Sequence, residues 1–328
     1  MVRATLFVFV LALFLAYVIA PLVTLIERYT SSRVPRAVSV LAAFMLVIGS
    51  VGIGATLTAP AVSDEAQLLS EQLPQLAEKA NLAKIPLPSS LEAFRGRLNV
   101  FVQENLKTAT LAAMPFARSV GTEILLFVGN LFFVVLIPIL AFFFVKDGPQ
   151  IRDALLRWLN PNALRGSDPS RIVSDVGVAL GHYVRALGLL SLATLIAYGT
   201  VFSLAGVPYA IFLAAIAAIL EIIPLLGPLT AALIALFVAG LSGYDHLLWI
   251  AGFILCYRIF QDYVLYPYLM GDGSQIHPVM IIFGLLAGEQ LGGVAGVFLS
   301  VPVIFSVVII TRYRRDSDAK STGASAPE

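Results

Sequence analysis

Long apolar runs limit what this chain can fold into more than any other feature of its sequence. A transmembrane α-helix needs about 20 mostly apolar residues, because each residue rises ~1.5 Å and the hydrocarbon core is ~30 Å thick. Five stretches meet this requirement: 4–26, 37–59, 121–145, 186–205 and 247–266. Apolar residues make up 59% of the chain and charged residues 12%, so a water-soluble fold would expose large apolar patches. The sequence therefore predicts an all-α, polytopic membrane protein with about five full spanning helices.

The distribution of lysine and arginine predicts how the chain is oriented. Thirteen of the 21 basic residues lie in three segments, 27–36, 146–185 and 312–328. The segment 61–120 holds six basic and six acidic residues and has no positive bias. An excess of Lys and Arg marks cytoplasmic loops. We therefore expect a bacterial inner-membrane protein whose three basic segments and C-terminus are cytoplasmic and whose 61–120 segment lies outside.

These patterns divide the chain into five consecutive segments. They are the N-terminal spanning helices (1–60), an extracytoplasmic insert of amphipathic helices (61–120), a spanning helix with a cytoplasmic interfacial segment (121–185), a transport core (186–311) and a disordered basic cytoplasmic tail (312–328). The apolar faces of the insert need a partner. Either they cover the membrane part of the same chain or they contact another subunit.

Two further apolar stretches, 207–241 and 276–310, are interrupted by proline and glycine. The interrupting residues are Pro224 and Gly227 in the first stretch and Gly292 and Gly293 in the second. Most arms beside the breaks are too short to cross ~30 Å of hydrocarbon as helices. They predict two re-entrant hairpins with tips inside the bilayer, although two short helices that each cross fully would fit the same orientation. Such broken pairs are the best sequence indication of a transporter binding site.

Each break carries a glutamate. Glu221 lies in the first break, and Glu289, followed by Gln290, lies in the second. A charge at the bilayer centre costs about 2.5 kcal/mol or more, so its presence needs a reason. One interpretation is that these glutamates carry a proton or a cation, or bind a polar substrate. The alternative is a protonated glutamate that bonds to backbone groups freed by the break.

The apolar stretch between the breaks supplies three more polar candidates. Arg258, Gln261 and Asp262 stand at positions i, i+3 and i+4, so they share one face of a helix. They either line a substrate path or, for Arg258 and Asp262, neutralise each other as an ion pair.

Several functions are disfavoured by what the sequence lacks. It has no Gly-x-x-x-x-Gly-Lys-Ser/Thr phosphate loop, so we expect no ATPase of its own. It has no Cys/His cluster for a metal and no Ser, His and Asp arrangement for hydrolysis, so we expect no cofactor and no enzyme activity. A net charge of +1 gives no indication of nucleic acid as a partner.

Ordered motifs along nearly the whole chain resemble those of the autoinducer-2 exporter family of permeases. They are Ala16-Tyr17, Pro21-Leu22, Phe143-Phe144-Val145-Lys146-Asp147, Gly206-Val207-Pro208, Ile223-Pro224-Leu225-Leu226-Gly227-Pro228, Pro267-Tyr268-Leu269-Met270-Gly271, Ile276-His277-Pro278 and Gly288-Glu289-Gln290-Leu291-Gly292-Gly293-Val294-Ala295-Gly296. The resemblance implies a multi-spanning secondary transporter that forms homo-oligomers. It also implies export of small polar molecules such as autoinducer-2, or sodium–proton exchange, as the activity.

The prediction is therefore a transporter that works by alternating access, without ATP, in contact with membrane lipid. Its path is expected between the two broken stretches, near Glu221 and Glu289, with Arg258, Gln261 and Asp262 beside it. The partners are small polar solutes or Na⁺ and H⁺. A non-transporting membrane scaffold, which assembles partners through the outside insert, is the rival class, and it would need no continuous cavity lined by polar residues of the spans.

Overall fold

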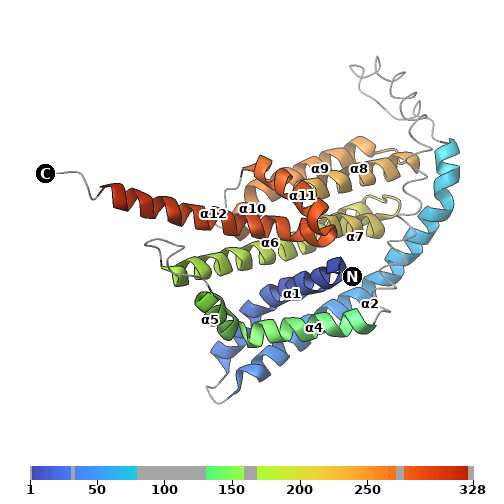
Figure 1. The fold of residues 1–328 in the computed structure, drawn as a ribbon. Helices are drawn as coiled ribbons and strands as arrows, with labels where there is room; N and C mark the ends of the chain where they lie inside the picture. Colours follow the sequence, from blue (N-terminus) through green and yellow to red (C-terminus); the bar gives the residue numbers. More distant parts are fainter. Residues whose placement is uncertain (1, 31–33, 80–130, 159–167, 271–276, 324–328) are drawn as a thin grey trace. The chain divides into compact units, whose positions relative to one another are not determined.

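The computed structural model describes residues 2–30, 34–79, 131–158, 168–270 and 277–323 (Figure 1). Every regular element within these ranges is helical. The elements are α1 (Val2–Tyr29), α2 (Arg36–Lys79), α4 (Leu131–Lys146), α5 (Gly148–Trp158), α6 (Pro169–Leu204), α7 (Ala210–Leu220), α8 (Leu226–Leu241), α9 (Leu247–Phe260), the π-helix η4 (Gln261–Leu265), α10 (Tyr266–Met270), α11 (Pro278–Gly292) and α12 (Val294–Gly323).

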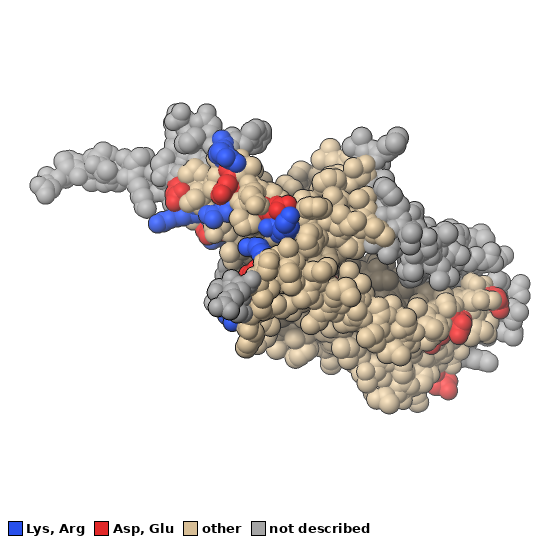
Figure 2. Space-filling model, turned by 90° about the horizontal axis from the view of Figure 1, so that it is seen from below, with Lys and Arg blue, Asp and Glu red and all other residues tan. Residues whose placement is uncertain are grey.

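Five runs of described helix are long and apolar enough to cross a membrane. They are Thr5–Tyr29, Arg36–Gln72, Pro169–Leu204, Leu247–Leu269 and Gly296–Tyr313. Large apolar side chains remain exposed along them, and Leu57, for example, is 75% exposed. In Figure 2, uncharged side chains cover most of the face shown. Hydrocarbon is a suitable solvent for such a surface, whereas water is not. The predicted all-α polytopic membrane fold is confirmed.

Several predicted boundaries differ from those of the helices. The predicted span 121–145 is described only from residue 131, where α4 begins, and residues 80–120 of the predicted insert lie outside the described residues. Helix α2 continues without a break past residue 60 to Lys79. Helix α12 continues through Pro302 to Gly323, beyond the predicted start of the tail at residue 312. Membrane helices tolerate proline, and α12 accordingly continues through Pro302.

The chain forms two compact units, each assembled from separate stretches of sequence. Unit 1 comprises Met1–Ser50, Phe132–Gly188 and Tyr266–Glu328, and unit 2 comprises Val51–Leu131 and Leu189–Leu265. The five consecutive segments predicted from the sequence therefore do not coincide with these units. The units are described one after the other.

In unit 1, α11 and α12 form a hairpin whose backbones nearly touch. Helix α11 ends at Gly292, and Gly293 reverses the chain with a φ of 60°, which favours glycine. A Cβ on Gly288 would lie 2.3 Å from the carbonyl oxygen of Gly296, so only glycine fits at this crossing. Small residues of this kind allow close helix packing in membranes. The predicted break at Gly292 and Gly293 is confirmed.

In unit 2, helix α7 is the most enclosed element. Seven of its eleven residues are buried, among them Phe212 and Leu213. They pack with Phe202 of α6 and Ile250 of α9, which are both fully buried. A helix that is apolar on all sides must lie inside a protein or a membrane. These contacts hold α7 in place within unit 2.

The amino-terminal end of α7 is fixed by the carboxyl-terminal half of α2. The Glu65 carboxylate accepts a hydrogen bond of 2.8 Å from the backbone N–H of Phe212, one of the amides in the first turn of α7. The Tyr209 hydroxyl donates a hydrogen bond of 2.8 Å to the side-chain oxygen of Gln72. An acidic side chain at a helix N-terminus satisfies free N–H groups and complements the helix dipole. Part of the predicted insert thus packs on the predicted transport core.

Candidate functional site

The break between α7 and α8 is a tight and strained turn. Leu225 has a φ of 68° and a ψ of −55°, which are unfavourable for a residue with a side chain. The N–H of Leu226 donates a hydrogen bond of 2.8 Å to the carbonyl oxygen of Pro224, which closes a γ-turn. Residues held in such conformations cost about 1–3 kcal/mol and are concentrated at functional sites. The predicted break at Pro224 and Gly227 is confirmed, and it places Glu221 at the end of α7.

Gly227 allows the two helices to meet at this break. A Cβ at this position would stand 1.7 Å from the carbonyl oxygen of Leu220, the last residue of α7. Only a residue without a side chain can therefore follow the turn, and the position of Glu221 depends on this contact.

Glu221 is buried although it is acidic. It is 6% exposed, and its carboxylate contacts side chains of neighbouring helices. The Thr194 hydroxyl of α6 donates a hydrogen bond of 3.2 Å to Oε2. The Arg258 Nη1 of α9 lies 3.7 Å from Oε1. A buried charge is tolerated only when it is paired and hydrogen-bonded, and these contacts meet that need.

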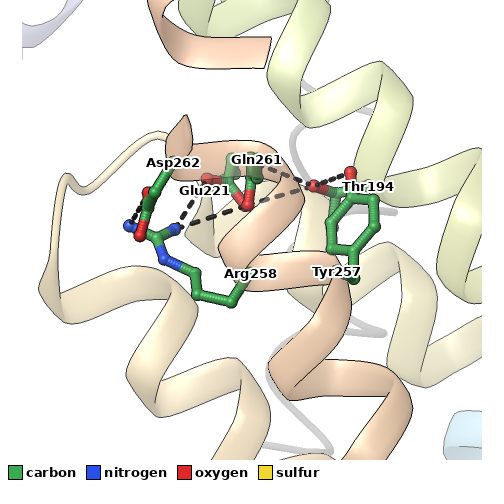
Figure 3. Close-up of polar contacts among 6 residues, drawn as sticks. All are labelled: Thr194, Glu221, Tyr257, Arg258, Gln261 and Asp262. Atoms are coloured by element: carbon green, nitrogen blue, oxygen red, sulfur yellow. Dashed lines mark hydrogen bonds and ion pairs between the residues drawn. The ribbon is translucent and has the colours of Figure 1, made fainter. Parts of the chain in front are cut away.

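Arg258 contacts a second carboxylate as well (Figure 3). Its Nη2 lies 2.7 Å from Oδ1 of Asp262, so the ion pair predicted from the i, i+4 spacing is confirmed. Its Nη1 donates a hydrogen bond of 3.4 Å to the side-chain oxygen of Gln261. Arg258 is the middle residue of the candidate span Leu247–Leu269. A charge at this depth of a membrane requires nearby partners.

Thr194 contacts three polar side chains of this site, and no sequence pattern pointed to it. Gln261 Nε2 donates a hydrogen bond of 3.4 Å to its hydroxyl oxygen, and the Tyr257 hydroxyl lies 3.1 Å away. A threonine hydroxyl has one proton and two acceptor positions. When Glu221 is ionised, its carboxylate accepts a hydrogen bond from the Thr194 hydroxyl, so Gln261 and Tyr257 donate hydrogen bonds to the Thr194 oxygen. All three hydrogen-bonding positions of the Thr194 hydroxyl are then filled, and Thr194 is 2% exposed.

The helix that carries Gln261 and Asp262 widens at this point. Residues Gln261–Leu265 form the π-helix η4 directly after α9. A π-helical turn inserts an extra residue into an α-helix and is common at functional sites. It places Gln261 in the buried cluster, at 2% exposure, while Asp262 is half exposed. We name the six residues of Figure 3 the polar cluster: Thr194, Glu221, Tyr257, Arg258, Gln261 and Asp262.

The predicted site residues of the second break belong to the hairpin of unit 1. Glu289 and Gln290 are exposed near the end of α11, and Gly292 is buried. The Glu289 carboxylate forms no ion pair with a described residue. Glu289 thus lies four residues before the turn at Gly293, as the sequence predicts, but in a different environment from Glu221. The structure brings Glu221, Arg258, Gln261 and Asp262 together in unit 2 and keeps Glu289 and Gln290 in unit 1.

The cluster combines one buried carboxylate, one guanidinium and three uncharged hydrogen-bonding side chains with a second, half-exposed carboxylate. Such a group can bind and release a proton, or contact a small polar solute, without assembling a catalytic nucleophile. No group of three or more His, Cys, Asp or Glu side chains suited to a metal ion occurs in the part of the chain that the structure describes.

Comparison with known proteins agrees with these features. The sequence model described as AI-2E family transporter matches residues 1–315. YrrI of Bacillus subtilis is 25% identical over 293 residues, which cover 89% of this chain and 82% of that protein. The Escherichia coli protein named AI-2 transport protein TqsA is 24% identical over 306 residues, covering 92% of this chain and 83% of that protein. The similarity therefore extends over most of the chain.

Proposed function

Because this chain belongs to the AI-2E family of transporters, we propose that it is a secondary transporter that exports small polar molecules by alternating access, without ATP. The polar cluster around Glu221 is its coupling and binding site. The observation that carries this proposal is a buried carboxylate paired with an arginine at the middle of a candidate span. Intramembrane charges of this kind are rare and mark substrate or ion pathways.

The chemistry of the cluster supports a small polar solute. Arg258 and Asp262 are partly exposed, at 33% and 43% of their side chains, so a guanidinium and a carboxylate are accessible to a solute. A relative is named for autoinducer-2 transport, and autoinducer-2 is a molecule of the proposed class. Glu289, Gln290, Gly292 and Gly293 remain predicted contributors from the other break. Homo-oligomer formation, the inner-membrane location and a cytoplasmic C-terminus likewise remain predictions.

Cation–proton exchange is the second candidate function. It is favoured by Glu221 itself, because a single buried carboxylate with a hydroxyl and an amide beside it can bind a proton or a small cation in turn. A membrane scaffold is disfavoured, because a buried ion pair adds little or no stability compared with apolar residues of similar size. A scaffold would therefore gain nothing from the pair of Glu221 and Arg258.

Flux through inverted membrane vesicles tests the proposal. A panel of small polar metabolites is offered with Na⁺ or H⁺ gradients, and uptake is compared with that of vesicles lacking the protein. Glu221→Gln is expected to lower flux about tenfold or more, equivalent to at least ~1.4 kcal/mol. Asp245→Asn, which neutralises an exposed acid of the α8–α9 connection, is the matched control and should transport normally.

The two candidate functions predict different results. Solute flux that needs no Na⁺ supports export, whereas Na⁺-dependent proton movement without any solute supports exchange. Flux that is equal in wild type and Glu221→Gln contradicts the assignment of the polar cluster. A rate equal to that of empty vesicles under every gradient contradicts transport itself.

A further inference from the structure

Arg258 is shared by two carboxylates that differ in distance and in exposure. Its contact with Asp262 is 2.7 Å long, and the Asp262 side chain is 43% exposed. Its contact with Glu221 is 3.7 Å long, and the Glu221 side chain is 7% exposed. One guanidinium cannot neutralise both, so with both acids ionised these three residues carry one negative charge. The surplus charge can be removed by a proton.

The geometry favours Asp262 as the steadier partner of Arg258. Asp262 lies one turn further along the same helical run, so movement of other helices does not separate the two. Glu221 lies on a different element, at the end of α7, and its distance to Arg258 is longer than that of a direct charge-assisted hydrogen bond, about 2.7–2.9 Å. The guanidinium has a fork of donors, so Nη1 and Nη2 can face the two acids at once.

The two oxygens of Glu221 differ in how closely they are contacted. Oε2 accepts a hydrogen bond from the Thr194 hydroxyl, Oε1 has the longer contact with Arg258, and the Gln261 amide also acts on the carboxylate. Oε1 is therefore the oxygen that we expect to take up a proton. The other titratable groups facing Glu221 are Tyr198 and Tyr257, whose phenols stay neutral at ordinary pH, together with Asp262. In the described part of unit 2, Arg258 is therefore the cation that competes with a proton for Glu221.

We propose that Asp262 is a positioning residue for proton binding, because it takes up Arg258 when Glu221 Oε1 binds a proton and returns it when the proton leaves. This inference rests on the proposed function of the polar cluster and states how that cluster is regulated. The proton comes from a hydronium ion: one of its O–H bonds breaks as the new O–H bond to Oε1 forms, and a water molecule is left. The charge of Glu221, Arg258 and Asp262 together changes from −1 to 0.

The partner exchange also explains how a proton could move the turn between α7 and α8. The contact of Arg258 with Glu221 joins α9 to the end of α7, next to the strained residue Leu225. When Arg258 turns fully to Asp262, this connection is released. The turn then loses one of the contacts that hold it in an unfavourable conformation.

Infrared difference spectroscopy of the purified full-length protein tests the exchange without any solute. Spectra recorded between neutral and acid pH show the carbonyl band of protonated carboxyl groups, and the component lost in Glu221→Gln belongs to Glu221. In Asp262→Asn, Arg258 has no second acid and stays on Glu221, so more acid is needed to protonate it. We expect the band to appear about one pH unit lower or more than in wild type.

A second pair of variants separates partner exchange from the field of the missing charge. In an Arg258→Gln background, removal of Asp262 should move the band much less if Arg258 carries the effect. An equal shift in that background overturns the proposal, as does an unchanged band in Asp262→Asn. Asp262→Glu keeps a carboxylate beside Arg258, so its band should appear at the wild-type pH. Asp245→Asn is the matched control. If Asp262→Asn does not purify as a folded protein, Asp262→Ser removes the same charge.

This measurement is independent of transport. If the band shifts as expected but no solute or ion is moved, the proposed function fails and the exchange stands. If flux depends on Glu221 while the band ignores Asp262, the exchange fails and the function stands.

Discussion

Replacing Gly227 with alanine is expected to displace the end of α7 and Glu221 with it. A Cβ at position 227 would stand 1.7 Å from the carbonyl oxygen of Leu220. Real Cβ atoms essentially never approach a neighbour more closely than 3.0 Å, so the two backbones must separate by at least 1.3 Å. The obstacle is a backbone oxygen at the end of a buried helix, and unlike a flexible side chain it cannot rotate away.

Two effects follow from this displacement. Overpacking costs about 1–3 kcal/mol, and in a domain of this size each 1 kcal/mol lowers Tm by roughly 2–4 °C. The hydrogen bond between Glu221 and Thr194 is 3.2 Å long. It is lost if the carboxylate moves away from Thr194 by as much as the backbones must separate, at least 1.3 Å. We therefore expect solute flux to fall about tenfold or more, the equivalent of ~1.4 kcal/mol.

Gly252→Ala in α9 is the matched control. A Cβ there meets no atom within 4 Å, and alanine is favoured over glycine inside a helix by ~0.5–1 kcal/mol. Thermal unfolding of both variants in detergent, followed by circular dichroism, gives the stability, and flux in proteoliposomes gives the activity. The reasoning is refuted if Gly227→Ala unfolds at the temperature of Gly252→Ala and transports at the wild-type rate.

Three further substitutions test other parts of the structure. Thr194→Val removes the hydroxyl at the centre of the polar cluster, and thermal unfolding should show a loss of about 1–3 kcal/mol because buried polar groups lose their partner. Leu225→Gly should keep or raise Tm despite the lost side chain, because glycine adopts a positive φ without strain, and a clear fall in Tm contradicts that strain. The hydroxyl and amide of Ser170 hold the pKa of Asp168 below its ordinary value of 3.8. The cap that Asp168 provides is therefore fully present above pH 3.8 and is lost as pH falls through the lower pKa of the folded state. Amide hydrogen exchange in the first turn of α6 should rise at that point, and Asp168→Asn should abolish this pH dependence.

The sequence was informative about the breaks because their causes are local. Gly293 reverses the chain with a φ that suits glycine, and Gly227 fits against a carbonyl oxygen that excludes any side chain. Pro302 was less informative, because α12 continues through it. In hydrocarbon the backbone has no water to bond to, so a helix is kept wherever neighbouring groups can compensate for a proline. A proline alone therefore does not decide whether a helix breaks, whereas both breaks contain a glycine whose backbone contact or positive φ disfavours a side chain.

The polar cluster could be predicted only where its members share a helix. The spacing of Arg258, Gln261 and Asp262 was enough to expect a common face and an ion pair. Thr194 comes from a different helix, and a lone threonine in an apolar run usually bonds to its own backbone. The π-helix η4 was not predicted either, because it depends on how the run packs in three dimensions. Contacts between distant segments are therefore what the sequence pattern lacked.

The energetics of the site argue that stability alone does not explain it. A buried ion pair can often be replaced by apolar residues without loss of folding stability, or with an increase in stability of about 1–4 kcal/mol. A non-glycine residue with the backbone angles of Leu225 adds a strain of about 1–3 kcal/mol. Two unfavourable features therefore lie within five residues of each other, in the otherwise well-packed core of unit 2. Local conflicts of this kind are expected at functional sites, where the sequence serves something other than the fold. A chain that needed only to sit in the membrane would gain stability from apolar residues in place of both Glu221 and Arg258 and from a glycine in place of Leu225. This is the strongest physical reason to look for transport at the end of α7.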